Sequence, residues 1–193
     1  MVKNGFTLVE LIVVIFLIAL FSVILTANFP AMLQQFALTR AAYRFSEDVR
    51  MAQDMGLSGT VTTNVKGYGI FIDINKVDPV NLGSAKYIIY GAEDSNKQYV
   101  YSSQINSVCG QQFPQDIGKD CIVKTVDLSK IENGIIIISP NSASINFTPP
   151  NPDTTITSLS SNDNNINVVF AVASNPSQTK TVSINTSGLI EVK

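Results

Sequence analysis

One end of the chain is dominated by an unbroken apolar run, residues 6–29, which holds a single charged side chain, Glu10. As an α-helix, these 24 residues would be about 36 Å long, enough to cross a hydrocarbon core of about 30 Å. Leu, Ile, Val and Phe occupy every side of that helix, so it lacks the polar face of an amphipathic surface helix. The run therefore predicts a membrane-spanning helix.

The residues before the run indicate how it crosses. Lys3 and the initiator amine are positive, and positive charge favours the cytoplasmic side of a membrane. The rest of the chain is then expected outside the cytoplasm. Two ordinary interpretations of the run are a signal peptide cut near Ala27 and a plain uncleaved anchor. Neither explains Glu10, because an unpaired carboxylate inside a membrane is costly.

A short motif at the start of the run does explain the acidic residue. Residues 5–10 read Gly-Phe-Thr-Leu-Val-Glu, with a lysine-containing leader before them and a long apolar stretch after them. This arrangement resembles the N-terminal motif of the type IV pilin and type II secretion pseudopilin superfamily. The resemblance implies that a prepilin peptidase removes residues 1–5 by cutting between Gly5 and Phe6, and methylates the new Phe6 amine. Glycine suits the cut because it has no Cβ to obstruct the peptidase.

The cut also suggests a role for Glu10 in filament assembly. It would leave an ammonium group on Phe6, one helical turn before Glu10. In a filament, the carboxylate of one subunit can pair with the Phe6 amine of a neighbour, and pairing makes both charges much less costly in an apolar interior. The alternative is that Glu10 simply extends to the membrane interface.

The resemblance implies partners and a location as well. The partners are other pilin or pseudopilin subunits through the N-terminal helix, the prepilin peptidase, an inner-membrane assembly platform, and the membrane before assembly. The precursor would cross the cytoplasmic (inner) membrane once, with its C-terminal domain outside the cytoplasm. After assembly it would belong to a periplasmic or extracellular filament.

The helical pattern resumes after Pro30, where a kink or local melting is expected because proline removes one backbone hydrogen bond. We expect one helix from residue 6 to about residue 57, with a membrane half at 6–29 and an exported half at 30–58. One apolar stripe, spaced by three and four, is expected to pack on the following domain: Leu38, Ala42, Phe45, Val49, Ala52 and Gly56. The opposite face is expected in solvent: Arg40, Arg44, Glu47, Asp48, Arg50, Gln53 and Asp54.

Residues 59–193 change in character to Thr, Val, Ile, Tyr, Asn and Ser, which favour strands. Strands are predicted at 60–65, 68–74, 86–90, 99–102, 122–128, 134–138, 144–147, 166–173, 180–185 and 189–192. Residues 135–138 form a continuous apolar run, which favours a central strand, and the last two strands indicate a closing hairpin. The predicted class is α+β: a long N-terminal helix packed on an antiparallel β-sheet domain, as in the pilin fold.

The chain has two cysteines, Cys109 and Cys121, and no histidine. Outside the cytoplasm, a disulfide between them is the natural interpretation, and it would contribute roughly 3 kcal/mol by closing a short loop. Two unpaired thiols are the alternative. Two thiols without histidine cannot fill a four-ligand zinc site.

No enzyme, cofactor or metal site is predicted. The absence of histidine removes Ser-His-Asp and Cys-His nucleophile pairs. The segment from Asp73 to Asp78 begins like a calcium loop but lacks the later acidic ligand and glycine, so a hairpin turn is expected there. The net charge of −2 argues against non-specific binding of nucleic acid.

Two functions remain open from the sequence. The first is a structural subunit of a type II secretion pseudopilus or type IV pilus, and the second is a tip adhesin or DNA-binding minor pilin on the same scaffold. Softer patterns resemble the minor pseudopilins and minor type IV pilins: residues 50–53 (Arg-Met-Ala-Gln), 67–73 and 182–190. Dispersed lysines in the C-terminal half favour the structural role.

Overall fold

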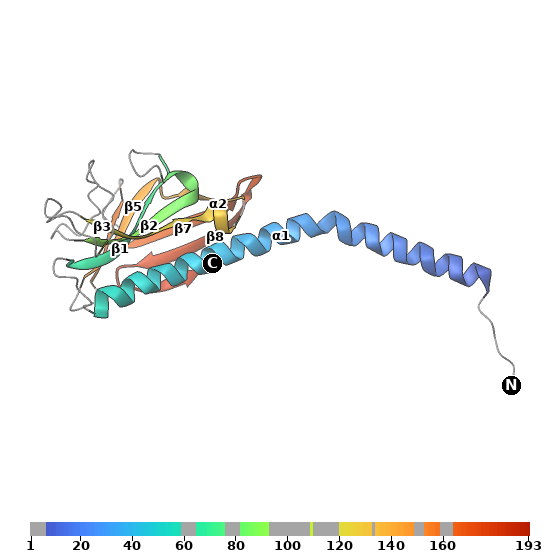
Figure 1. Cartoon of the computed structure of the whole chain (residues 1–193), viewed down its shortest axis with the longest axis horizontal. Coiled ribbons are helices and arrows are strands. Elements are labelled where there is room, and N and C mark those ends of the chain that lie inside the picture. Colours follow the sequence, from blue (N-terminus) through green and yellow to red (C-terminus); the bar gives the residue numbers. More distant parts are fainter. Residues whose placement is uncertain are drawn as a thin grey trace, which may run out of the picture. The chain divides into compact units, whose positions relative to one another are not determined.

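The computed structural model of the chain describes residues 7–58, 65–75, 82–92, 109, 120–132, 134–148, 153–158 and 164–193. Its contacts fall into two compact units, Met1–Phe36 and Ala37–Lys193. One helix of 51 residues, α1 (Leu8–Ser58), contributes to both units (Figure 1). The predicted domain boundaries remain predictions, but the second unit includes the end of the helix as well as the β-strands.

Helix α1 begins at a local cap and ends close to the predicted residue. The Thr7 hydroxyl accepts a hydrogen bond from the Glu10 N–H at 3.3 Å, and the Thr7 carbonyl accepts from the Leu11 N–H. Pro30 lies inside the helix, with helical residues on both sides. Local melting at Pro30 is therefore not seen, and the predicted kink stays a prediction.

The strands of the second unit form two antiparallel sheets (Figure 1). The five-stranded sheet has the order β3-β2-β1-β5-β6, from β3 (Cys121–Asp127), β2 (Lys86–Ala92), β1 (Gly67–Asp73), β5 (Ser142–Thr148) and β6 (Asp153–Ser158). The four-stranded sheet has the order β4-β7-β8-β9, from β4 (Ile135–Ser139), β7 (Asn165–Val172), β8 (Asn175–Asn185) and β9 (Ile190–Val192). Two short helices, η1 (Gly83–Ala85) and α2 (Leu128–Ile131), complete the described elements.

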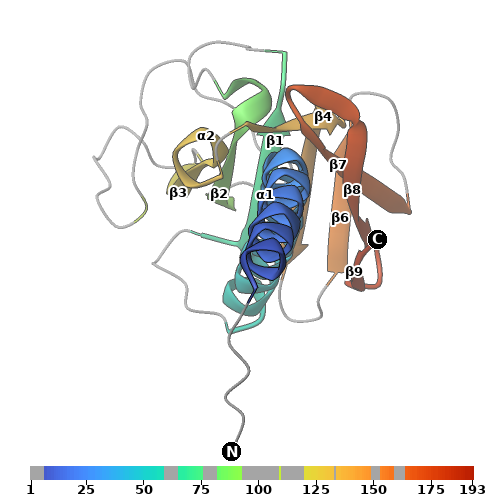
Figure 2. The ribbon, with the colours of Figure 1, turned by 90° about the vertical axis from the view of Figure 1, so that its right-hand side faces the viewer.

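The core of the second unit forms where the end of α1 packs on both sheets. The buried helix residues are Leu38, Ala41, Ala42, Phe45, Val49 and Ala52, which confirms the predicted apolar stripe. The Phe45 ring lies 5.1 Å from the Tyr87 ring of β2, edge to face, and 5.3 Å from the Phe170 ring of β7. One helix side chain thus contacts both sheets, and Figure 2 shows α1 with strands of both sheets around it.

Glycine permits two close approaches that larger residues would block. A Cβ on Gly56 would lie 2.7 Å from the Phe147 carbonyl oxygen, so glycine lets the end of α1 approach β5. Gly69 of β1 is paired with Tyr90 of β2, and a Cβ there would meet the Tyr90 ring. The Tyr90 hydroxyl reaches across β1 to the Ser144 hydroxyl of β5.

The predicted α+β class is confirmed, and most predicted strands in the described residues are found. The closing hairpin is confirmed, because β8 and β9 pair around Ile184 and Ile190. Strand β6 was missed, since its Thr-rich sequence lacks an apolar alternation, and β8 begins five residues earlier than predicted. The predicted strand at 99–102, and residues 60–64 of the strand predicted at 60–65, lie outside the described residues.

Two sequence predictions were wrong. Residues 135–138 do not form a central strand, because β4 is at the edge of the four-stranded sheet as the described strands define it. Its apolar run has another cause: Ile135 and Ile137 face the core, while Ile138 is 37% exposed. The second error concerns Asp48: the helical pattern predicts it on the solvent face of α1, but the side chain is buried.

Candidate functional site

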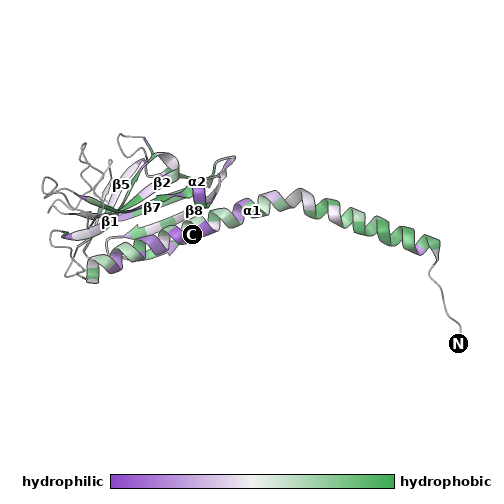
Figure 3. Cartoon of the chain, viewed as in Figure 1, coloured by the Kyte–Doolittle hydropathy of each residue, from purple (hydrophilic) through white to green (hydrophobic). Residues whose placement is uncertain are grey.

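The part of α1 in the first unit presents apolar side chains to every side. Its large apolar residues are all exposed from Leu8 to Phe36, and the helix is long and apolar enough to cross a membrane. Figure 3 shows that hydrophobic colouring predominates along this part of the helix and that the colouring is mixed in the second unit. An apolar surface of this extent is unfavourable in water and requires lipid or other helices around it.

Glu10 is the one charged side chain between Thr7 and Thr39. It is exposed and lies in the first turn of α1, where the unpaired N–H groups of the helix favour a carboxylate. Gly5 and Phe6 lie outside the described residues. The cleavage between them and the pairing of Glu10 with a Phe6 amine therefore remain predictions.

Thr7 is a functional residue that the sequence reasoning missed. Its hydroxyl caps the helix through the Glu10 N–H, and a threonine three residues before a glutamate is the sequence signature of a capping box. That spacing was available as a signal in the sequence. The cap begins the helix immediately after the predicted cleavage site.

A buried ionic cluster joins α1 to the five-stranded sheet. The Tyr87 hydroxyl donates to Asp48 Oδ2 at 2.7 Å, and Lys124 Nζ lies 2.9 Å from Asp48 Oδ1. These two partners explain why Asp48 is buried, since a paired and hydrogen-bonded carboxylate tolerates desolvation. Burial, with the neighbouring Asp48 carboxylate, raises the pKa of the Tyr87 hydroxyl far above its ordinary value of 10.

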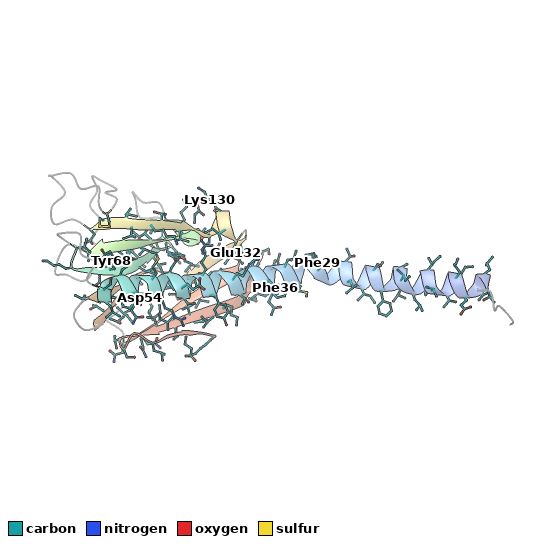
Figure 4. The ribbon with its side chains drawn as sticks, turned by 60° about the horizontal axis from the view of Figure 1, so that its bottom comes forward. Phe29, Phe36, Asp54, Tyr68, Lys130 and Glu132 are labelled. Carbon is teal, nitrogen blue, oxygen red and sulfur yellow. A yellow bond between two sulfur atoms is a disulfide. The ribbon has the colours of Figure 1, made fainter. Side chains whose placement is uncertain are left out.

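A second ion pair lies on the same side of α1. Arg40 Nη2 lies 2.8 Å from Glu132 Oε2, although the two residues are separated by 92 positions in the chain. Figure 4 shows Glu132 beside α1 and Lys130 projecting away from it. Between the two ion pairs lies an open groove of about 570 Å³, lined by Thr39, Arg40, Tyr43, Arg44, Glu47, Asp48, Lys124 and Glu132.

The predicted disulfide is confirmed. Cys109 and Cys121 are bonded, and the Cys109 N–H donates to the carbonyl of Ile122 at 3.0 Å. The bond therefore holds residue 109 against the first residues of β3, an edge strand among the described strands. Cys121 packs with Val65 and Tyr68 in a small buried cluster.

The residues that the structure describes contain no group of three or more Asp, Glu, Cys or His side chains that could hold a metal ion. Asp73 instead accepts a hydrogen bond from the Asn75 N–H at 2.9 Å, which closes a local turn. Asp78, the last residue of the calcium-loop pattern, lies outside the described residues.

Comparison with known proteins gave one finding. A family model described as "Prokaryotic N-terminal methylation motif" matches residues 1–26. No curated protein and no solved structure matches the chain. The motif, the exposed apolar helix and the antiparallel β-domain together support a type IV pilin-like protein, anchored in a membrane and later assembled into a filament.

Proposed function

We propose that this chain is a minor pseudopilin of a type II secretion pseudopilus, or the corresponding minor subunit of a type IV pilus. The observation that carries the proposal is the motif match at residues 1–26, which lies on a helix with exposed apolar side chains throughout its first unit. A subunit of a filament needs such a helix, because neighbouring helices replace the lipid during assembly.

The proposed sequence of events begins in the membrane. The precursor inserts through residues 6–29, and the peptidase removes residues 1–5 and methylates the Phe6 amine. Glu10 of an incoming subunit then pairs with the Phe6 amine of a neighbour. Since either charge alone is costly in an apolar bundle, the pair favours one stagger between subunits.

The disulfide supports a location outside the cytoplasm for the β-domain. Structural disulfides persist in oxidising compartments and are rare in the cytoplasm. Cys109 and Cys121 are bonded and partly or fully buried. Together with Lys3 before the helix, this bond favours an orientation with the N-terminus in the cytoplasm.

The processing step can be tested by intact-mass measurement of the full-length protein, expressed with and without a prepilin peptidase. We expect the mature chain to lack residues 1–5 and to carry one extra methyl group at Phe6. Gly5→Val should leave the precursor uncut, because a branched side chain obstructs the scissile bond. A mature chain that starts at any residue other than Phe6 would refute the proposal.

A further inference from the structure

The hydrogen bonds at the start of α1 fix where the helix begins. The Leu11 N–H donates to the Thr7 carbonyl at 3.3 Å, and the first helical residue is Leu8. Thr7 therefore occupies the N-cap position, the residue just before the helix, whose carbonyl already accepts a helical bond. Because the motif predicts a cut between Gly5 and Phe6, only Phe6 separates the scissile bond from this cap.

The Thr7 hydroxyl also takes the donor that a longer helix would need. It accepts a hydrogen bond from the Glu10 N–H at 3.3 Å. In an α-helix that began one residue earlier, the same N–H would donate to the Phe6 carbonyl, because each helical N–H bonds to the carbonyl four residues before it. The Thr7 side chain therefore competes directly with extension of the helix towards the scissile bond.

The residues around Thr7 together have the pattern of a helix start. Thr7 and Glu10 are spaced as in a capping box, with the glutamate three residues after the cap. Phe6 and Leu11 occupy the two positions of a hydrophobic staple, one before the cap and one four residues after it. The residues matched by the methylation-motif model thus include a complete signature for a helix that starts at Leu8.

The leader contains a second residue that can start a helix. Asn4 lies three residues before Thr7, and asparagine is among the most favourable N-cap residues. In a helix capped by Asn4, the Gly5 carbonyl would accept a hydrogen bond from the Val9 N–H. The scissile bond would then lie inside the first helical turn, where the backbone of that turn packs around its carbonyl group.

We propose that Thr7 is a positioning residue for prepilin processing: its hydroxyl starts the helix at Leu8 and so keeps the bond between Gly5 and Phe6 open to the peptidase. This inference rests on the proposed cleavage. Hydrolysis adds the hydroxyl of a water molecule to the Gly5 carbonyl carbon and a proton to the Phe6 nitrogen, as the bond between these two atoms breaks. The water must approach one face of that carbonyl, which an extended segment leaves open and a helical turn restricts.

Thr7→Val tests the role of the hydroxyl, because valine keeps the branched shape of threonine and replaces the hydroxyl by a methyl group. Full-length precursor in detergent would be mixed with a prepilin peptidase, and the loss of residues 1–5 would be followed by intact mass. We expect the cleavage rate to fall about fivefold, the factor by which the loss of an N-cap typically shifts a helix equilibrium. Thr7→Ser, which keeps the hydroxyl, should be cut at the wild-type rate.

Thr26→Val is the matched control, because it makes the same change further along the same helix. The Thr26 hydroxyl donates to the Ser22 carbonyl at 2.8 Å, and its loss should leave the cleavage rate unchanged.

The helix start would be measured separately, from the carbon chemical shifts of residues 4–7 of the precursor in detergent micelles. Thr7→Val should move the shifts of residues 5 and 6 towards helical values. Adding Asn4→Ala to Thr7→Val removes the alternative cap and should restore most of the lost rate, whereas Asn4→Ala alone should have no effect.

The outcomes separate this inference from the proposed function. If the wild-type precursor is not cut between Gly5 and Phe6, the proposed function itself is refuted. If the wild type is cut there and Thr7→Val is cut equally fast, the positioning role is refuted. Slow cleavage of Thr7→Val with an unchanged helix start would assign the hydroxyl to direct contact with the peptidase and would also overturn the inference.

Discussion

The two parts of α1 belong to one continuous helix but differ in how their apolar side chains are buried. Residues 8–36 bear apolar side chains on all sides and, within their own unit, leave them exposed. Residues 37–58 confine their buried apolar side chains to one stripe, which packs against both sheets. The first part requires lipid or other helices around it, whereas the second part packs against the strands of its own chain.

This contrast shows that the burial of a side chain on a helix depends on which elements pack against that helix, and not on the helical conformation alone. Phe21 and Phe45 have the same side chain on the same helix, and only Phe45 has sheet residues around it. The two acidic residues Glu10 and Asp48 differ in the same way. Glu10 has no cation near it among the described residues, while Asp48 has Lys124 and Tyr87.

The largest effect is expected from Glu10→Gln. In the proposed filament the change leaves a Phe6 amine without its carboxylate, and an unpaired buried charge costs about 3–5 kcal/mol. Incorporation into filaments should fall more than about 100-fold, while the thermal unfolding of the β-domain stays unchanged. Filament shearing followed by immunoblotting would measure this, with Glu47→Gln as the control; normal incorporation of Glu10→Gln would disprove the pairing.

The second prediction compares the two phenylalanines directly in full-length protein in detergent. Phe45→Ala should lower the free energy of unfolding by about 3–5 kcal/mol, because it removes the ring that packs against both Tyr87 and Phe170 and leaves a cavity there. Phe21→Ala should change it by less than about 0.5 kcal/mol, since Phe21 is exposed within its own unit. Denaturant titration measures both values, and equal losses would contradict the division of α1 into two parts.

A smaller effect is expected from Asp48→Asn. It removes the charge that holds Lys124 and weakens the hydrogen bond from Tyr87, so we expect a loss of about 2–3 kcal/mol in the free energy of unfolding. Asp54→Asn is the matched control, because Asp54 is exposed on the same helix. If both variants were equally stable, the cluster would contribute nothing to the attachment of α1.

The smallest effect is a pH dependence that originates at Tyr87. Because the pKa of Tyr87 is raised in the folded protein, its contribution to stability is complete below pH 10 and is lost as the pH rises above that value. Tyr87→Phe should cost about 1–2 kcal/mol at neutral pH and should flatten the decline above pH 10. An unchanged slope in urea titrations from pH 8 to pH 11 would assign the alkaline instability to other groups.

Local patterns predicted much of this fold. The apolar stripe of α1 and the hairpin of β8 with β9 depend on neighbouring residues, and both were found where the spacing placed them. Patterns failed where the outcome depended on distant partners. Four isoleucines in a row could not show that β4 is an edge strand, and the Thr-rich sequence of β6 gave no apolar alternation to detect.

The candidate site divides in the same way. The motif at residues 5–10 and the apolar run after it lie within one short stretch of chain, so the sequence alone determined the expected processing and the need for a membrane. The burial of Asp48, the pairing of Arg40 with Glu132 and the groove between them were decided by the tertiary structure. The physical reason is that a charge can be buried only where a partner compensates it, and these ion-pair partners lie 76 and 92 positions apart in the chain.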